Sequence, residues 1–160
     1  MISVLRRIAP LFAVVIVGVG ILTPAAPASA SRAGVLAAQA VAATNKYRVA
    51  HGCRAVRVNS ALARTARLHS YDMARRGYFS HVGKTTGTFV QRARRQGYNF
   101  AVGENLAMGH TNATTLVYSG WGKSPGHRRN LLDCRAKTVG IGVHFNAKGV
   151  PYWTQVFGAR

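Results

Sequence analysis

The feature that most constrains the fold is a pair of apolar segments near the C-terminal end of the sequence. Residues 139–145 alternate apolar residues with glycine, and residues 150–157 are again largely apolar. Between them, residues 146–149 have the asparagine and glycine of a tight turn. This pattern predicts an antiparallel β-hairpin. A sheet this small needs helices packed against it to form a core.

Segments with helical periodicity precede the hairpin. Residues 34–50 carry apolar side chains at helical spacing. Residues 60–76 form a second such segment, with Asn59 as its N-cap and Gly77 just beyond its end. One face of this second helix is apolar and the opposite face is basic. His69 falls on the apolar face, and we interpret it as a buried, hydrogen-bonded core histidine.

Three shorter helices and one extended segment complete the predicted elements. The helices are predicted over residues 88–96, 112–118 and 125–132, and the extended segment over residues 100–108. Ser124-Pro125 has the form of an N-cap followed by proline at the first helical position. The order of these elements predicts helices packed against a small antiparallel sheet, which is an α+β fold.

The first thirty residues have the order of a secretory signal peptide. Arg6 and Arg7 precede a 15-residue apolar stretch, and small residues end the segment at Ala30. The apolar stretch is shorter than the roughly 20 residues of a membrane-spanning helix, although a retained N-terminal anchor is the alternative. We expect cleavage after Ala30, a secreted product without a transmembrane segment, and a single domain over residues 31–160.

The two cysteines, Cys53 and Cys134, are the only ones in the chain. In an exported protein an even pair predicts one disulfide. It would close a loop of about 80 residues, worth roughly 4–5 kcal/mol in the chain-entropy model. The alternative is two buried thiols. A metal site is not indicated, because neither cysteine has a partner in a CxxC motif.

Acidic residues are scarce. Glu104 is the only glutamate, and the other two acids are Asp72 and Asp133, against 22 lysines and arginines. Small and apolar residues surround Glu104, so a buried and paired carboxylate is expected. Such a carboxylate is either functional or a structural acid tied to one arginine that fixes a loop. The octapeptide 102–109 alone does not distinguish these alternatives.

Three residues lie at the edges of predicted elements and could line a cleft: His81, Glu104 and His127. His127 would be the third residue of the helix that begins at Pro125. The helix dipole disfavours an imidazolium there, and a neutral imidazole can accept a proton or bind a metal. Two histidines and one carboxylate also describe a catalytic zinc set. The alternative is a structural hydrogen-bond cluster that joins three segments.

Other catalytic motifs fail on physical grounds. Residues 122–126 match G-x-S-x-G, but the residue after Ser124 is Pro125, which has no N–H for an oxyanion hole. The preceding stretch is also predicted to be helical, whereas a nucleophile elbow follows a strand. Two Gly-Lys-Ser/Thr triplets lack the first glycine of a P-loop. With three acids, a two-carboxylate glycosidase is strongly disfavoured.

Short motifs over nearly all of residues 31–160 resemble those of the CAP superfamily, which comprises the cysteine-rich secretory, antigen 5 and pathogenesis-related-1 proteins. The resemblance is to its short, secreted bacterial branch. In family order the motifs are Asn45-Lys-Tyr-Arg48, Asn59 to Leu62, His69-Ser-Tyr-Asp-Met-Ala74, Gly77-Tyr-Phe-Ser-His81, Gly103-Glu-Asn-Leu-Ala107, Trp121, Ser124-Pro-Gly-His127 with Asn130, Gly140-Ile-Gly-Val143, and Tyr152-Trp-Thr-Gln-Val-Phe157.

This resemblance implies an α-β-α sandwich with a central cleft, in which two histidines and two glutamates can hold a divalent metal in some members. Carried over, His81 is the first histidine and Glu104 the first glutamate. Tyr152 stands where the second histidine is expected, and Ser124 where the second glutamate is expected. The full metal set is therefore absent, and the bacterial motif brings His127 into the cleft instead. The predicted ligand cleft consists of His81, Glu104, Asn105, Ser124, His127 and Tyr152.

The first functional hypothesis is a non-enzymatic extracellular binding module that requires no cofactor. Without Arg6 and Arg7 the net charge of +19 becomes +17, which favours an anionic partner such as a cell-wall polymer or a lipid. Nucleic acid is disfavoured, because no nucleic-acid module is recognisable and export separates the protein from most nucleic acid. The sequence carries no signal for an oligomeric state. The basic residues expected on exposed faces are Arg64, Arg67, Arg75, Arg76, Arg92, Arg94, Arg95, Arg128 and Arg129.

The second hypothesis is a peptidase-like hydrolase that works through His81, Glu104 and His127. These side chains would activate water directly or through a divalent metal such as zinc. On this hypothesis, Glu104→Gln abolishes activity and leaves the fold largely intact.

Overall fold

The computed structural model describes residues 31–160, so the predicted signal peptide, residues 1–30, lies outside the described residues. The regular helices are α1 (Arg32–Ala50), α2 (Ser60–Arg76), α3 (Phe89–Arg95), α4 (Ala113–Thr115) and α5 (Pro125–Leu131). The strands are β1 (Arg57–Val58), β2 (Ala101–Met108), β3 (Thr138–Phe145) and β4 (Pro151–Gly158). No helix within 31–160 is long and apolar enough to cross a membrane.

The four strands form one sheet in the order β1-β3-β4-β2. Strands β3 and β4 form the predicted C-terminal hairpin, and the predicted extended segment becomes β2, which runs antiparallel to β4. The sheet is not purely antiparallel, because β1 pairs in parallel with the start of β3. Strand β1 is not among the predicted elements, since two exposed residues carry no alternating pattern.

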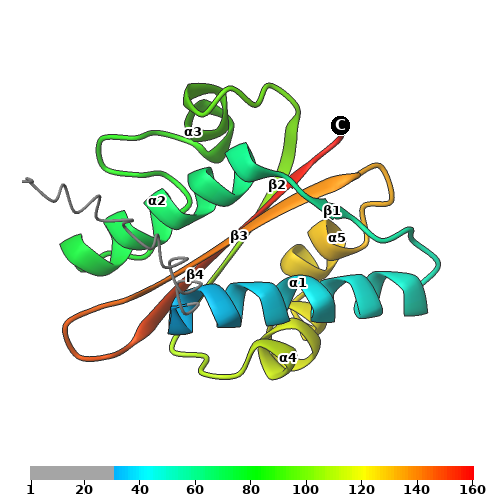
Figure 1. The fold of residues 1–160 in the computed structure, drawn as a ribbon, viewed down its shortest axis with the longest axis horizontal. Coiled ribbons are helices and arrows are strands. Elements are labelled where there is room, and N and C mark those ends of the chain that lie inside the picture. Colours follow the sequence, from blue (N-terminus) through cyan, green and yellow to red (C-terminus); the bar gives the residue numbers. More distant parts are fainter. Residues whose placement is uncertain (1–30) are drawn as a thin grey trace, which may run out of the picture.

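Helices cover both faces of this sheet, as the α-β-α sandwich requires (Figure 1). Odd-numbered residues of β3, such as Ile141, join a cluster with α1, whereas Gly140 and Gly142 face α2. A Cβ on Gly142 would lie 2.2 Å from the backbone nitrogen of Arg67, so the absent side chain is what lets α2 lie this close to the sheet.

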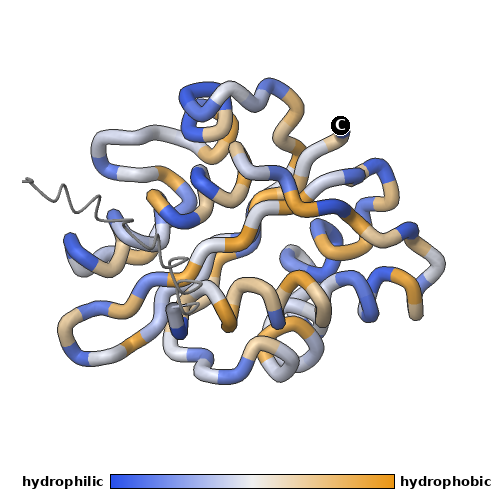
Figure 2. The backbone as a smooth tube through the Cα atoms, in the orientation of Figure 1, coloured by the Kyte–Doolittle hydropathy of each residue, from blue (hydrophilic) through white to orange (hydrophobic). Residues whose placement is uncertain are grey.

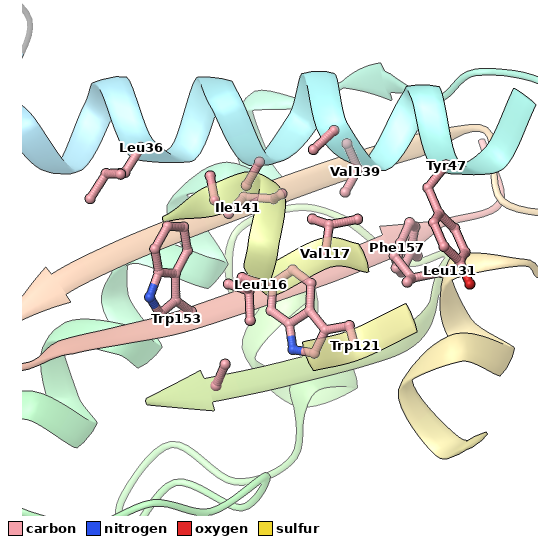
Figure 3. Close-up of a cluster of buried hydrophobic side chains, with 14 of the residues drawn as sticks. Leu36, Tyr47, Leu116, Val117, Trp121, Leu131, Val139, Ile141, Trp153 and Phe157 are labelled. Atoms are coloured by element: carbon pink, nitrogen blue, oxygen red, sulfur yellow. The ribbon is translucent and has the colours of Figure 1, made fainter. Parts of the chain in front are cut away.

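The larger part of the core lies between the sheet and the layer of α1, α4 and α5 (Figure 3). Trp153 and Ile141 point from the sheet toward α1, and Leu36 and Tyr47 point back from α1 (Figure 3). The hydropathy colouring shows the apolar residues concentrated along the strands and the helix faces turned toward them (Figure 2). Both tryptophans of the chain, Trp121 and Trp153, are almost completely buried.

The helix boundaries follow local capping signals. Helix α1 begins two residues before the predicted segment, because the Ser31 side chain accepts from the Gly34 N–H and caps it. Asn59 caps α2 in the same way, and Gly77 ends α2 with φ of 65°, so both predictions are confirmed. His69 is buried, with Nε2 2.9 Å from the Ser80 carbonyl oxygen, which confirms the core histidine.

The segment predicted as a helix over 112–118 is longer and less regular. After α4, one π-helical turn runs over Leu116–Gly120 and one 3₁₀ turn over Trp121–Lys123. Periodicity at 3.6 residues per turn does not anticipate these changes of pitch. The π-helical and 3₁₀ turns place Trp121 in the core, where its indole N–H donates to the Leu106 carbonyl oxygen at 2.9 Å.

The predicted disulfide between Cys53 and Cys134 is present. Beside it, the buried side chain of Arg48 donates to the carbonyl oxygens of Arg54, Leu131, Asp133 and Ala136. Burial lowers the pKa of Arg48, an effect partly offset by the negative charge of Asp133. The disulfide and Arg48 together tie the end of α1 to the segment that leads into β3.

Candidate functional site

The candidate site is built around β2, which forms one edge of the sheet. Side chains alternate between the two faces of a strand, so Glu104 and Asn105 point into opposite helical layers. Glu104 meets α3, whereas Asn105 meets α5. Within residues 31–160 no strand pairs with the outer side of β2, so both helical layers border this edge.

The Glu104 carboxylate contacts two partners, of which one is buried and the other is exposed. One carboxylate oxygen lies 2.5 Å from a guanidinium nitrogen of Arg92, and the other lies 2.9 Å from Nδ1 of His81. The exposed fractions of the Glu104 and Arg92 side chains are 1% and 5%, against 56% for His81. Glu104 is therefore a buried, paired carboxylate, as expected, and it connects a buried cation to a solvent-facing imidazole.

Arg92 also fixes the loop that carries His81. Its Nη1 donates to the His81 carbonyl oxygen at 3.0 Å and to the Gly87 carbonyl oxygen. Arg92 therefore ties Glu104 to this loop, which is the arrangement that the structural alternative for Glu104 describes. This structural role coexists with the contact between Glu104 and the exposed ring of His81.

On the other face of β2, an amide network anchors α5. Asn105 donates to the Gln155 side-chain oxygen at 2.9 Å and to the His127 carbonyl oxygen at 3.2 Å. Asn130 donates to the Asn105 side-chain oxygen at 2.8 Å and to the Glu104 carbonyl oxygen at 2.9 Å. Three of these hydrogen bonds fix α5, and with it His127, against the strand that carries Glu104, and the fourth joins β2 to β4.

His127 is half-buried at the third position of α5, as predicted. Burial lowers its pKa, and the nearby positive charge of His81 lowers it further. The neutral imidazole expected from the sequence is therefore favoured, although the causes are burial and His81. The contact that joins His127 to the strand of Glu104 is the hydrogen bond from the Asn105 side chain to the His127 carbonyl oxygen.

The predicted zinc set does not form a coordination group. Among residues 31–160, no three His, Cys, Asp or Glu side chains are arranged to hold a metal ion. Both carboxylate oxygens of Glu104 and Nδ1 of His81 are engaged with protein partners. The residues present therefore do not fit a metal in this arrangement, and we derive no chemical step through one.

Tyr152 and Ser124 occupy different surroundings. Tyr152 is buried with Met73 and Leu106, four positions along β4 from the residue paired with Glu104, which is roughly 13 Å along a strand. Ser124 is half-buried at the N-cap position of α5, and its side chain makes no capping hydrogen bond. A 3₁₀ turn rather than a strand precedes Ser124, which confirms that the G-x-S-x-G match is not a nucleophile elbow.

Arg92 is buried, so its prediction on an exposed face is wrong. Arg92 is buried because Glu104 lies under α3 and needs a cation there. A usable signal existed, since Arg92 lies three residues after Phe89, on the same face of the helix, and Phe89 packs against the core. The other eight arginines of that set are exposed, as predicted.

Residues 41–157 match the CAP family, described as the cysteine-rich secretory protein family. The chain therefore belongs to this family, as the motifs suggested. It is 36% identical over 118 residues to an uncharacterized membrane protein, YlbC, of Bacillus subtilis (strain 168), a match that covers 73% of this chain and 32% of YlbC. It is 30% identical over 136 residues to the uncharacterized protein YkwD of the same organism, covering 84% of this chain and 50% of YkwD.

Solved structures agree with the family assignment. An extracellular protein containing an SCP domain from Bacillus anthracis str. Ames superposes with a TM-score of 0.72 at 32% identity, over 80% of this chain and 41% of that protein. An outer surface protein of Borrelia burgdorferi gives a TM-score of 0.67 at 19% identity, over 75% of this chain and 89% of that one, and shows the fold alone. The chain spans between about a third and a half of the length of the two Bacillus subtilis relatives. It is an extracellular-type CAP domain of the kind found in bacteria.

Proposed function

We propose that residues 31–160 are a single secreted CAP domain, released from a signal peptide, that acts as a non-enzymatic binding module for an anionic ligand outside the cell. The ligand class is a phosphate-bearing or carboxylate-bearing wall polymer or an anionic lipid. The observation that carries the proposal is where the cations lie. Of the 20 lysines and arginines that remain without Arg6 and Arg7, only Arg48 and Arg92 are buried.

The three acids do little to offset this surface charge. Glu104 is used inside the protein, where it pairs with Arg92. Asp72 pairs with Arg76 at 2.7 Å, and Asp133 pairs with Arg135 at 2.8 Å. The remaining exposed lysines and arginines within the described range have no carboxylate partner. An excess of one sign over a surface attracts and steers ligands of the opposite sign.

One hollow along α5, the helix that carries His127, suits such a ligand. It has a volume of about 490 Å³ and is lined by Lys123, Arg128 and Arg129 together with Pro125 and Leu132. The three cations would contact an anionic group of the ligand, and the two apolar side chains would contact a less polar part of the same ligand molecule. Arg128 is held in place, because its Nε donates to the Tyr47 hydroxyl at 3.2 Å.

The test is co-sedimentation of the purified, oxidised protein with isolated cell walls and with vesicles containing anionic lipid, over a salt series. We expect binding to weaken steeply from low salt to 0.5 M salt, because screening shortens the reach of exposed charges. Neutral vesicles should bind little. Binding that is indifferent to salt would refute the electrostatic proposal.

Two matched triple variants locate the binding surface. Lys123→Gln, Arg128→Gln and Arg129→Gln together remove three charges from the hollow. Arg64→Gln, Arg67→Gln and Arg75→Gln remove the same number from the exposed face of α2, without touching the hollow. We expect the first variant to lose much more affinity than the second. Equal losses would mean that net charge, rather than this hollow, determines binding.

A hydrolase is the second candidate, and one contact favours it. Glu104 engages Nδ1 of His81, which orients the exposed ring and leaves its Nε2 outside that contact. A carboxylate that orients a histidine in this way supports general-base action on water or on a substrate hydroxyl. The half-buried His127, whose pKa is lowered, would be the second proton carrier.

The hydrolase is best tested with His81→Asn, because His81 is exposed and its replacement leaves the buried ion pair intact. Loss of a general base should reduce a peptidase or esterase rate by about 10²–10⁴-fold. The exposed His51, which contacts Tyr47 away from Glu104, gives the matched control His51→Asn. Calorimetric titration with zinc should accompany the assay. Full activity in His81→Asn would eliminate this mechanism, and stoichiometric zinc binding lost in this variant would bring the metal hypothesis back.

A further inference from the structure

A small pocket lies behind the candidate site, between α2, α3 and the loop that joins them. We call it the α2–α3 pocket. His69 of α2, Thr86 of the loop and Arg92 of α3 form its inner wall, and Arg95 stands among its outer residues. Its volume is about 60 Å³, several times the roughly 10–15 Å³ of comparable volume that one water requires.

Three buried polar atoms of this pocket have no hydrogen-bond partner within residues 31–160. They are Nδ1 of His69, Oγ1 of Thr86 and Nε of Arg92. These are the only such side-chain atoms among the described residues, and all three belong to residues that line the same pocket. Because an unpaired buried polar group is costly, this coincidence indicates that the pocket receives an occupant.

The loop holds the buried Thr86 hydroxyl oxygen close against Gly83. Gly83 and Gly87 pair with each other through two backbone hydrogen bonds and close the turn tightly. A Cβ on Gly83 would collide with the Thr86 hydroxyl oxygen, at 1.9 Å. Arg95 donates to the Thr86 carbonyl oxygen, which brings its guanidinium to the pocket.

The hydrogen-bond chemistry of the three atoms defines the ligand. Arg92 Nε offers an N–H, and the Thr86 hydroxyl can donate as well. Nε2 of His69 faces the Ser80 carbonyl oxygen, which only accepts, so Nε2 carries the proton. Nδ1 of a neutral His69 is therefore an acceptor, and it becomes a donor when His69 is protonated.

We propose that the α2–α3 pocket binds a small oxyanion, with Arg92, Thr86 and Arg95 as donors and one shared proton between the ligand and His69 Nδ1. Arg92 is already neutralised by Glu104, but Arg95 has no carboxylate partner among the described residues, so the pocket retains a positive charge. A water molecule would also form hydrogen bonds with the three atoms, but it is neutral and would leave the positive charge of Arg95 unbalanced. This site is separate from the cationic hollow proposed above and does not depend on it.

The shared proton makes anion binding depend on pH. The charged groups around His69 are Arg92 of α3, Glu104 of β2 and Asp72 of its own helix. The ring of Tyr78 lies edge-on to that of His69, with 6.3 Å between the ring centroids, and Arg95 lines the same pocket. Burial and the charge of Arg92 lower the pKa of His69, whereas Glu104 and Asp72 raise it. A bound anion adds negative charge and should raise this pKa. For an anion that does not itself titrate, affinity should increase about tenfold for each unit that the pH falls, until His69 is protonated in the free protein.

The experiment uses sulfate and ethyl sulfate as probes, because neither takes up a proton between pH 5 and 8. The ring resonances of His69 and the backbone amide of Thr86 are followed by NMR at constant ionic strength. Sulfate represents a free anion, and ethyl sulfate represents an oxyanion carried on a larger molecule. If only sulfate binds, the ligand of the pocket is a free anion. If ethyl sulfate binds as well, the pocket also accepts an oxyanion that is esterified to a larger molecule.

Two matched pairs of variants test the assignment. Thr86→Val removes the buried, unpaired hydroxyl, whereas Thr85→Val changes an exposed neighbour that does not line the pocket. Arg95→Gln and the exposed Arg94→Gln remove one charge each, but only Arg95 lines the pocket. We expect sulfate affinity to fall about fivefold in Thr86→Val and by a similar factor in Arg95→Gln, with little change in the controls.

Several outcomes would overturn the proposal. His69 resonances that ignore sulfate at both pH 5 and pH 7 would mean that the pocket holds water only. Equal losses in Thr86→Val and Thr85→Val would place the anion elsewhere on the cationic surface. An affinity that is independent of pH would exclude the shared proton. Because Thr86 and Arg95 lie outside the buried ion pair, these variants should keep the fold, which thermal unfolding of each variant verifies.

Discussion

Replacing Arg92 by methionine should be among the most destabilising single substitutions in the domain. It leaves the Glu104 carboxylate, with 1% of its side chain exposed, without its buried cation. Removing one partner of a buried ion pair costs about 3–5 kcal/mol. The hydrogen bonds from Arg92 to the carbonyl oxygens of His81 and Gly87 are lost as well. Domains of this size have about 5–15 kcal/mol of stability, so the variant should be marginally folded.

A double-mutant cycle separates the ion pair from the other contacts. Glu104→Leu alone should cost about 3–5 kcal/mol, because it leaves the Arg92 guanidinium buried and unpaired. The double variant contains no unpaired buried charge. It still lacks the two loop hydrogen bonds, at about 1 kcal/mol each. We therefore expect it to lose about 2–3 kcal/mol, whereas independent effects would total about 6–10 kcal/mol.

The assay is equilibrium unfolding in urea followed by tryptophan fluorescence. Trp121 and Trp153 are buried in the core cluster on the opposite face of the sheet, so they report unfolding without touching the substituted pair. Arg94→Met, at an exposed position of the same helix, is the control and should change stability by less than about 0.5 kcal/mol. A double variant whose loss equals the sum of the single losses within about 0.5 kcal/mol would show that the pair is not coupled.

Three further predictions follow from the fold and the site. Replacing Cys53 and Cys134 by serine should lower stability by about 4 kcal/mol, since the bond closes a sequence separation of 81 residues; an unchanged urea midpoint would contradict the loop-entropy argument. Gly142→Ala should unfold or strongly destabilise the protein, because the new methyl meets the backbone of α2, while Gly126→Ala, in open space, should be tolerated. The lowered pKa of His127 means that the unfolded chain binds its proton first, so stability should fall as the pH drops below about 6.5, and His127→Gln should show a smaller decrease.

Local patterns allowed most of the fold to be predicted. Caps such as Asn59 and breakers such as Gly77 act within one or two turns, and the alternation of β3 and β4 is visible in the sequence. Strand β1 was missed because its pairing with β3 is decided in three dimensions, over a separation of about eighty residues. The π-helical turn over Leu116–Gly120 was missed because its cause is the placement of Trp121 in the core.

The candidate site was predicted in part. The isolation of Glu104 in a basic chain indicated a buried pair, and its contact with His81 is present at 2.9 Å. The partner Arg92 was not identified, because Arg92, Arg94 and Arg95 lie within seven residues of one short helix. Which of the three arginines is buried depends on which face of α3 packs against β2, and this is decided by the tertiary structure. Glu104→Gln removes the charge that neutralises the buried Arg92, so we now expect this substitution to lower stability as well as any activity.

The distribution of charge leads to one more prediction, in which salt acts on folding and on binding with opposite signs. With Arg48 satisfied by four carbonyl oxygens and Arg92 paired with Glu104, the interior is close to neutral and the surplus charge lies at the surface. Surface charges of one sign repel each other and destabilise the compact state.

The Debye length falls from about 10 Å at 0.1 M salt to about 3 Å at 1 M salt. Sodium chloride should therefore raise the Tm over this range, even as it releases the protein from anionic walls and vesicles. Thermal unfolding and co-sedimentation at the same salt concentrations measure both effects. The triple variant Arg64→Gln, Arg67→Gln and Arg75→Gln, with less repulsion, should show a smaller rise in Tm. A Tm that falls with salt would mean that exposed ion pairs such as Asp72–Arg76 contribute more to stability than the repulsion removes.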